Sequence, residues 1–368
     1  MEGSKMKTFL LCAGPTNVSR EVKQALVCRN MCHRDEEFSE ILLRTNKNLI
    51  KCLGIESSYS AVLFASSATG CNEAVISCIH GKILLIDSGK YSQRMGDIAN
   101  RYNIPLRTIR LSNFAASPEL IEDALIKDAD ITHIMFVHHE TVSASLAPIE
   151  KICAIANRYN KLTVVDAVSS LFGHKLDIEK LNITFCTVNA NKCLESFPGV
   201  SFVIGNTTEI KKLKGRSRSY YFDLYMHWEY ERNGVTPFTT PVQLVSAVDK
   251  AIHRLIDEGI CNRIERYKAL AHRLRAGLRK IGFKLCILPE NVQSNIVTTI
   301  LIPSKFDYWM FYKALKCKGI SIYPDLDAPE KKQFNLATLG SITIEDIDLI
   351  IERIENSLVE LGYINLLK

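Results

Sequence analysis

The chain has 368 residues, of which 47% are hydrophobic, 23% charged and 8% aromatic, a composition typical of one or two globular domains. It excludes a disordered, collagen-like or coiled-coil chain, and no apolar run reaches the roughly 18 residues of a membrane-spanning helix. The net charge of +6 is small for this length, and basic residues do not alternate with aromatic ones, so we expect neither a nucleic-acid nor a membrane partner.

Short apolar runs rich in β-branched residues recur through the first two thirds of the chain and predict buried strands. They cover residues 61–64, 82–86, 106–111, 131–137, 162–165, 184–188 and 200–204. Segments with helical periodicity lie between several of them, at 92–102, 117–126 and 148–159. This alternation predicts a parallel-rich sheet with helices on both faces.

The pattern changes near Pro241. The chain is helical in period from there to Ile281, with a break at Gly259. The last third predicts strands at 295–302, 319–323 and 333–339, with helices at 306–318 and 343–361. We therefore divide the chain into an N-terminal arm (1–16), a large domain (17–245) and a small α+β domain (246–368).

The twelve cysteines have neither Cys-x-x-Cys spacing nor a Cys/His cluster with zinc-site spacing. Several lie inside apolar runs, as Cys186 does. We expect buried free thiols in a reducing cytoplasm and no bound metal. The paired His138 and His139 have no acidic or cysteine partner at ligand spacing, which also argues against a metal.

Two charged residues follow predicted strands. Lys192 comes shortly after the strand at 184–188, and a buried lysine there can have a lowered pKa and attack an aldehyde. Asp166 ends the strand at 162–165, where open α/β sheets bind ligands, and its carboxylate could pair with a protonated ring nitrogen. Taken singly, a solvent-reaching lysine and a turn-capping aspartate explain them better.

The stretch Ala65–Glu73 follows a strand and opens a helical segment. Its small and hydroxyl-bearing residues suit a phosphate held at a helix N-terminus. A plain helix cap is the alternative, and the P-loop pattern is absent.

The order of these elements changes the interpretation. The predicted phosphate-binding stretch Ala65–Glu73, which we call the phosphate cradle, is followed by Asp166 and, 26 residues after that, by Lys192. This order and spacing resemble those of the class V, fold-type I aminotransferases that use pyridoxal 5′-phosphate. The resemblance covers roughly residues 8–345 and includes further stretches at 12–15, 32–38, 88–94 and 139–149. It implies a large domain with a mostly parallel seven-stranded sheet sandwiched by helices, and a smaller α+β C-terminal domain.

The resemblance also implies roles for single residues. Lys192 would form a Schiff base with the cofactor and carry the proton, while Asp166 would hold the pyridine nitrogen. The other cofactor contacts would come from Ser67, Ala68, Thr69, Tyr91, Thr141, Ser143, Asn191 and, toward the neighbouring subunit of a homodimer with sites at its interface, Thr239.

Within the class, the resemblance is greatest to the branch that acts on 2-aminoethylphosphonate and pyruvate. Three departures matter. The family's loop glycine is Ala144 here, its Tyr-Pro-Gly-Lys stretch is replaced at 323–326, and Asn335 replaces an arginine that grips the substrate's anionic group. Asparagine supplies one neutral donor group where arginine supplies a charged fork. Other cations would have to serve, and the candidates are Arg34, Arg216, Arg218 and His227.

The resemblance therefore implies a cytoplasmic aminotransferase that moves an amino group from a small amine such as 2-aminoethylphosphonate to pyruvate or a similar 2-oxo acid. One alternative is another class V enzyme, either an alanine- or serine–glyoxylate-type transaminase or a lyase or decarboxylase, whose substrate lacks the clamped anion. Another is a binding or regulatory protein that keeps the fold without turnover. The presence of both Lys192 and Asp166 argues against the last.

Overall fold

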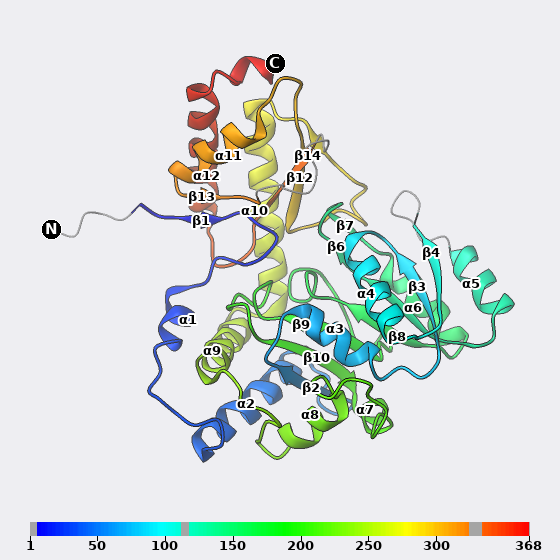
Figure 1. Cartoon of the computed structure of the whole chain (residues 1–368). Helices are drawn as coiled ribbons and strands as arrows, with labels where there is room; N and C mark the ends of the chain where they lie inside the picture. Colours follow the sequence, from blue (N-terminus) through cyan, green and yellow to red (C-terminus); the bar gives the residue numbers. More distant parts are fainter. Residues whose placement is uncertain (1–5, 112–117, 324–332, 368) are drawn as a thin grey trace.

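The computed structural model describes residues 6–111, 118–323 and 333–367 (Figure 1). Its central sheet has seven strands in the order β2-β10-β9-β8-β5-β3-β4. β10 runs antiparallel to β2 and β9, and the other neighbouring pairs are parallel, which confirms the mostly parallel seven-stranded sheet. The strands are β2 (Tyr59–Phe64), β3 (Lys82–Asp87), β4 (Leu106–Arg110), β5 (Ile131–Val137), β8 (Leu162–Asp166), β9 (Phe185–Asn189) and β10 (Ser201–Asn206).

The sheet is apolar on both faces because each face meets its own core. In β3, Leu84 and Ile86 pack into one cluster, while Ile83 and Leu85 pack into another, as the two-residue period of a strand requires. The second cluster contains α3 (Ala68–Ile76), α4 (Lys90–Arg101), α7 (Thr207–Lys211) and α8 (Leu224–Glu231). The first contains α1 (Arg20–Ala25), α2 (Glu36–Leu53), α5 (Pro118–Lys127), α6 (Ile149–Arg158) and α9 (Val242–Glu258).

A smaller unit lies beyond one edge of the sheet (Figure 1). It contains an antiparallel sheet of β11 (Leu285–Cys286), β12 (Val297–Leu301) and β14 (Gln333–Ala337). The helices are α10 (Ile260–Ile281), α11 (Tyr308–Cys317), α12 (Ile344–Glu360) and the 3₁₀ turn η1 (Ile364–Leu366). The expected strand at 319–323 forms only over β13 (Ile320–Ser321), and it pairs with β1 (Phe9–Leu10) of the N-terminal arm.

The helical stretch after Pro241 breaks where the sequence predicts. Gly259, with φ of +80°, ends α9 and precedes α10, a conformation that favours glycine. α9 runs through residue 245 without interruption and packs against α1 and α2, and the domain boundary drawn there stays a prediction. Among the described residues, no helix has the length and apolar character needed to cross a membrane.

Candidate active site

The predicted cofactor residues of the large unit gather at one edge of the central sheet. β2, β9, β8, β5 and β3 all run in the same direction, so their carboxyl ends lie along a single edge. The segments that follow β2, β9, β5 and β3 carry Ser67–Thr69, Asn191 and Lys192, Thr141–Ser143 and Tyr91, and Asp166 is the last residue of β8. Open α/β sheets bind ligands at this edge.

Lys192 lies in a turn, three residues after β9 ends. Its Nζ donates a hydrogen bond to the carbonyl of Ala13 in the N-terminal arm. Gly14, which follows Ala13, leaves the space that Lys192 occupies, because a Cβ on Gly14 would lie 2.6 Å from that Nζ. Burial lowers the pKa of Lys192, and the carboxylate of Asp166 is among the groups that oppose this shift. The amine is therefore closer to its reactive neutral form than an exposed lysine is.

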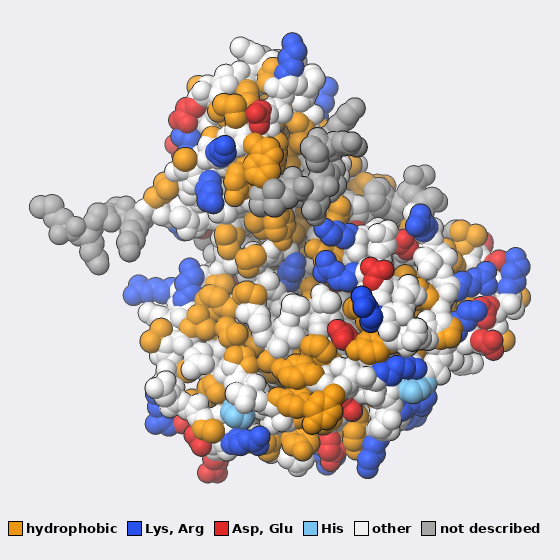
Figure 2. Space-filling view, in the orientation of Figure 1, with side chains coloured by type: hydrophobic (Ala, Val, Ile, Leu, Met, Phe, Trp, Pro, Cys, Tyr) orange, Lys and Arg blue, Asp and Glu red, His pale blue; other side chains and the backbone are white. Residues whose placement is uncertain are grey.

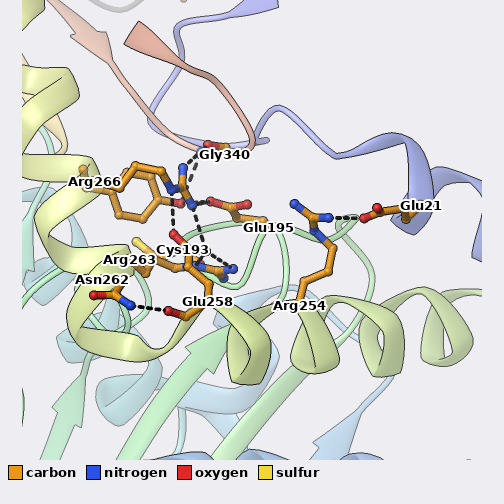
Figure 3. Close-up of polar contacts among 10 residues, drawn as sticks. Glu21, Cys193, Glu195, Arg254, Glu258, Asn262, Arg263, Arg266 and Gly340 are labelled. Atoms are coloured by element: carbon orange, nitrogen blue, oxygen red, sulfur yellow. Dashed lines mark hydrogen bonds and ion pairs between the residues drawn. The ribbon is translucent and has the colours of Figure 1, made fainter.

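Helix α10 holds the Lys192 turn through a buried polar network (Figure 3). Arg263 donates to the carbonyl of Cys193 at 3.1 Å. The carboxylate of Glu195 accepts from Arg266 at 2.7 Å and from the hydroxyl of Tyr267 at 2.6 Å. The amide of Glu195 in turn donates to the carbonyl of Lys192 at 2.9 Å. The small unit thus fixes the backbone that carries the candidate nucleophile.

Asp166 is buried at the last position of β8. Its Oδ2 accepts from the side-chain amide of Asn72 at 2.8 Å, and its Oδ1 accepts from the backbone of Val168 at 3.0 Å. Thr187 orients Asn72 by donating to its Oδ1 at 2.7 Å. Burial raises the pKa of Asp166, and the two hydrogen bonds, Lys192 and Arg94 oppose the rise. A nearby cation would favour the ionised carboxylate further.

The start of α3 presents free backbone N–H groups at the same edge. Ser67 precedes the helix without capping it through its side chain. In the described structure the Gly70 amide donates to the carbonyl of Ser67 at 2.9 Å, and the amides of Ala68 and Thr69 remain for a ligand. The guanidinium of Arg94, from α4, lies 3.5 Å from Thr69 Oγ1. Arg94 was not among the predicted site residues, although it is the last residue of the stretch 88–94 that resembles the family. The helix dipole and this cation together favour a phosphate here.

Glu140 connects the segment that carries Tyr91 to the loop that carries Val142, and it was also not among the predicted site residues. Its buried carboxylate accepts from the backbone amides of Tyr91 and Val142, both at 3.1 Å. A Cβ on Gly89 would lie 2.9 Å from its Oε2. Burial raises the pKa of Glu140 despite these bonds. The Tyr91 ring has the guanidinium of Arg94 5.2 Å from its centroid.

The side-chain amide of Asn335 donates to backbone carbonyls and is therefore not free to donate to a ligand. Its Nδ2 donates to the carbonyls of Thr141 and Val142, each at 3.0 Å. Ser143, in the same loop, contacts Ser145 Oγ at 2.8 Å. Ala144 has φ of +54°, which explains why the resembling family places glycine at this position. The residue that replaces the arginine therefore links β14 to the loop that follows β6 (His139–Glu140).

Within the described chain, the other predicted residues form no polar contact with this group. Thr239 and Arg34 are both exposed. Arg216 is exposed as well, and Arg218 donates to the carbonyls of Ser77 and Ile79. His227 contacts the carbonyl of Tyr221 at 3.0 Å. Figure 2 nevertheless shows Lys and Arg side chains gathered where the small unit meets the sheet-containing unit.

Comparison with known proteins gives consistent results. Residues 16–323 match the family described as aminotransferase class-V. The chain is 35% identical to the 2-aminoethylphosphonate–pyruvate transaminase of Lysinibacillus sphaericus, over 95% of this chain and 97% of that protein. It is 34% identical to the protein of the same name from Bacteroides fragilis, over 94% and 98% respectively.

Solved structures show the same fold. An alanine–glyoxylate aminotransferase from Nostoc sp. superposes with a TM-score of 0.87 at 23% identity, covering 97% of this chain and 98% of that one. A ureidoglycine–glyoxylate aminotransferase from Bacillus subtilis also reaches 0.87, at 21% identity and with 98% and 95% coverage. At these identities the likeness establishes the fold alone.

Proposed function

The chain belongs to the class-V aminotransferase family, and from this premise we propose that it transfers the amino group of 2-aminoethylphosphonate to pyruvate with pyridoxal 5′-phosphate as its cofactor. Both substrates are taken from the names of relatives that align with nearly the whole chain. The observation that carries the proposal is the meeting of Lys192, Asp166 and the α3 N-terminus at one sheet edge.

The polar groups at this edge fit that cofactor. Twelve buried side-chain atoms of the described residues lack a hydrogen-bond partner, and three of them, His139 Nε2, Asn191 Oδ1 and Asn335 Oδ1, belong to the segments that meet at this edge. Buried polar atoms are normally paired, so such atoms are available to a polar ligand. When bound, pyridoxal phosphate stabilises the negative charge that develops on the substrate carbon as it loses a proton.

Each residue then has a chemical task. The lowered pKa of Lys192 would let its neutral Nζ attack the aldehyde of the cofactor and, later, take and return the proton of the substrate's amine-bearing carbon. Asp166 would keep the ring nitrogen protonated. The phosphate would lie against Ser67, the Ala68 amide, Thr69 and Arg94, with Tyr91 stacked on the ring and with Thr141, Ser143 and Asn191 at its polar edge.

A homodimer would complete the site. Thr239 lies exposed beside Phe238, which stacks on Tyr221 with centroids 4.8 Å apart. Tyr220, 82% exposed, contacts Phe238 as well. Exposed aromatic clusters of this kind are typical of interfaces. We propose that this segment lies against the phosphate site of the partner subunit. A dimer in sedimentation measurements and weaker cofactor binding by a Thr239→Ala variant would support this arrangement.

The phosphonate needs a cation that Asn335 does not provide. Arg34 remains as a candidate because it is exposed and its guanidinium has no ion pair among the described residues. Replacing it by glutamine should raise KM for 2-aminoethylphosphonate and leave KM for pyruvate nearly unchanged. An unaltered KM for the amine would remove Arg34 from the proposal.

The test of the function is a half-reaction. Purified holoenzyme is mixed with 2-aminoethylphosphonate in the absence of any oxo acid, and the absorbance of the aldehyde form of the cofactor is followed. We expect its loss on mixing, its return on addition of pyruvate, and neither change with Lys192→Ala. The absence of any change with this amine at saturation would refute the proposed donor.

A second candidate rests on Asn335 alone. Because its Nδ2 already serves two carbonyls, the site is compatible with a substrate that has no anion at this position, as in another transaminase or a lyase of this family. Alanine and serine, with glyoxylate as acceptor, are the matching probes. A spectral change with alanine but none with 2-aminoethylphosphonate would select this candidate.

A further inference from the structure

A cavity lies between α10 and the loop 287–295, and none of the residues assigned to the cofactor lines it. Its volume is about 720 Å³, within the range of roughly 300–1,000 Å³ that is usual for small-molecule sites. One face of α10 supplies Lys268, His272, Arg275 and Arg279 to its lining. Steps of four, three and four residues place these side chains in one stripe along the helix.

The lining is cationic and nearly free of compensating acid. Among the described residues that line the cavity, Glu290 is the one with a carboxylate, and it is exposed. Within that described part, none of the four α10 side chains forms an ion pair with an acid. Like charges four residues apart destabilise a helix. Burial, with a smaller effect from the positive charge of Arg279, lowers the pKa of Arg275 to about 10.

Two of the lining groups are buried, which separates this cavity from an ordinary solvated charged face. Arg275 is 6% exposed and donates only to neutral acceptors, which are the carbonyls of Ser294 and Val297 and the hydroxyl of Thr298. His174 is 4% exposed, and its Nε2 has no hydrogen-bond partner within the described structure. A buried charge without a counter-ion and an unpaired buried nitrogen are both costly unless a ligand satisfies them.

We propose that this cavity binds a small multivalent anion, a metabolite that carries a phosphate or several carboxylates. The stripe from Lys268 to Arg279 is about 16 Å long at the α-helical rise, which suits several negative charges better than a single monovalent ion. Arg275 would contact the buried end of the anion, and Lys268 and Arg279, which are less buried, would contact its outer charges.

The ligand would also lie one ring away from the cofactor edge. The rings of His174 and His139 are 5.1 Å apart in an edge-on contact, and His139 Nε2 is one of the unpaired atoms at that edge. The anion site is nevertheless separate from the phosphate cradle, because neither Lys192 nor the first turn of α3 lines the cavity. Its existence does not depend on the identity of the amino donor.

The test compares two variants that each remove two positive charges. Inorganic pyrophosphate and citrate are titrated calorimetrically into the holoenzyme, into Lys268→Gln/Arg279→Gln and into Lys280→Gln/Lys284→Gln. All four side chains are at least partly exposed, and Lys280 and Lys284 do not line the cavity. We expect the Kd of the preferred probe to rise about tenfold or more in the first variant, since charge-assisted contacts are lost, and to change about twofold at most in the second.

Each outcome is decisive. A preference for pyrophosphate or for citrate identifies the phosphate-bearing or the carboxylate-bearing class. Equal weakening in both variants would indicate a general charge effect and overturn the proposal, as would a failure of the wild-type enzyme to bind either probe at millimolar concentration. Unchanged binding in the Lys268→Gln/Arg279→Gln variant would place the anion at the active site and also overturn it. A thermal midpoint that rises with the probe in the wild type and in Lys280→Gln/Lys284→Gln, but not in Lys268→Gln/Arg279→Gln, would confirm the result on folded protein.

Discussion

Removing a single oxygen atom tests how strongly α10 secures the Lys192 turn. Tyr267 is fully buried, and its hydroxyl donates to Glu195 at 2.6 Å and accepts from the backbone amide of Gly340 at 3.3 Å. Tyr267→Phe keeps the ring, so no large cavity forms. The carboxylate of Glu195 retains Arg266 at 2.7 Å as a partner, whereas the described structure offers the Gly340 amide no second acceptor.

The expected loss of stability follows from these two contacts. A hydrogen bond to a charged group contributes about 1.5–3 kcal/mol, and an unpaired buried amide adds about 1 kcal/mol, so we expect a total of about 2–4 kcal/mol. An unfolding entropy of about 2.1 cal/mol/K per residue gives about 0.8 kcal/mol/K for a chain of this length. The midpoint of thermal unfolding should therefore fall by about 3–5 °C.

The assay is calorimetric or dichroic melting of the holoenzyme at fixed protein concentration. Tyr230→Phe is the matched control, because Tyr230 is 45% exposed and surface substitutions usually change stability by less than about 0.5 kcal/mol. If Tyr267→Phe melts within about 1 °C of the wild type, the network shown in Figure 3 does not stabilise the turn as we have argued.

Three further predictions concern the candidate site. Arg94→Gln removes the cation beside Thr69, so Kd for pyridoxal phosphate, measured by equilibrium dialysis, should rise about 10- to 100-fold; an unchanged Kd would exclude Arg94 from the cradle. The apoprotein should capture pyridoxal phosphate more slowly as the pH falls through the lowered pKa of Lys192, and Asp166→Asn should move this midpoint to lower pH because the carboxylate raises that pKa; a midpoint that rises would contradict the assignment. Asn335→Arg should lower KM for an amine that places its anion there by about 10- to 100-fold, and no change in KM would place the anion elsewhere.

The sequence alone was sufficient to predict the sheet, because buried strands depend on local patterns, and it singled out two site residues whose roles stay predictions. Buried parallel strands are short apolar runs, and each of the seven predicted runs overlaps a strand of the central sheet. Asp166 comes directly after one of these runs, and Lys192 comes shortly after another. Lysine and aspartate are rarely buried, so their positions alone marked them as candidates.

Other contacts could not be predicted because they join segments that are distant in the sequence. Asn72 lies in an otherwise ordinary helical segment, and Glu140 and Arg94 lie in stretches that resemble the family without revealing what they contact. Only folding brings the three to Asp166, Tyr91 and Thr69. The same is true of β13, whose partner β1 lies more than 300 residues away. α2 escaped prediction although it is amphipathic.

Asn335 shows most clearly where sequence reasoning ends. The residue type established that a charge was missing, but only the structure showed that its amide donates to the Thr141 and Val142 carbonyls. The cationic stripe on α10 is similar, since the spacing of its residues is visible in the sequence while the burial of Arg275 is not. Residue identity determines which charges a chain carries, and tertiary packing decides which of them are solvated, paired or left facing a cavity.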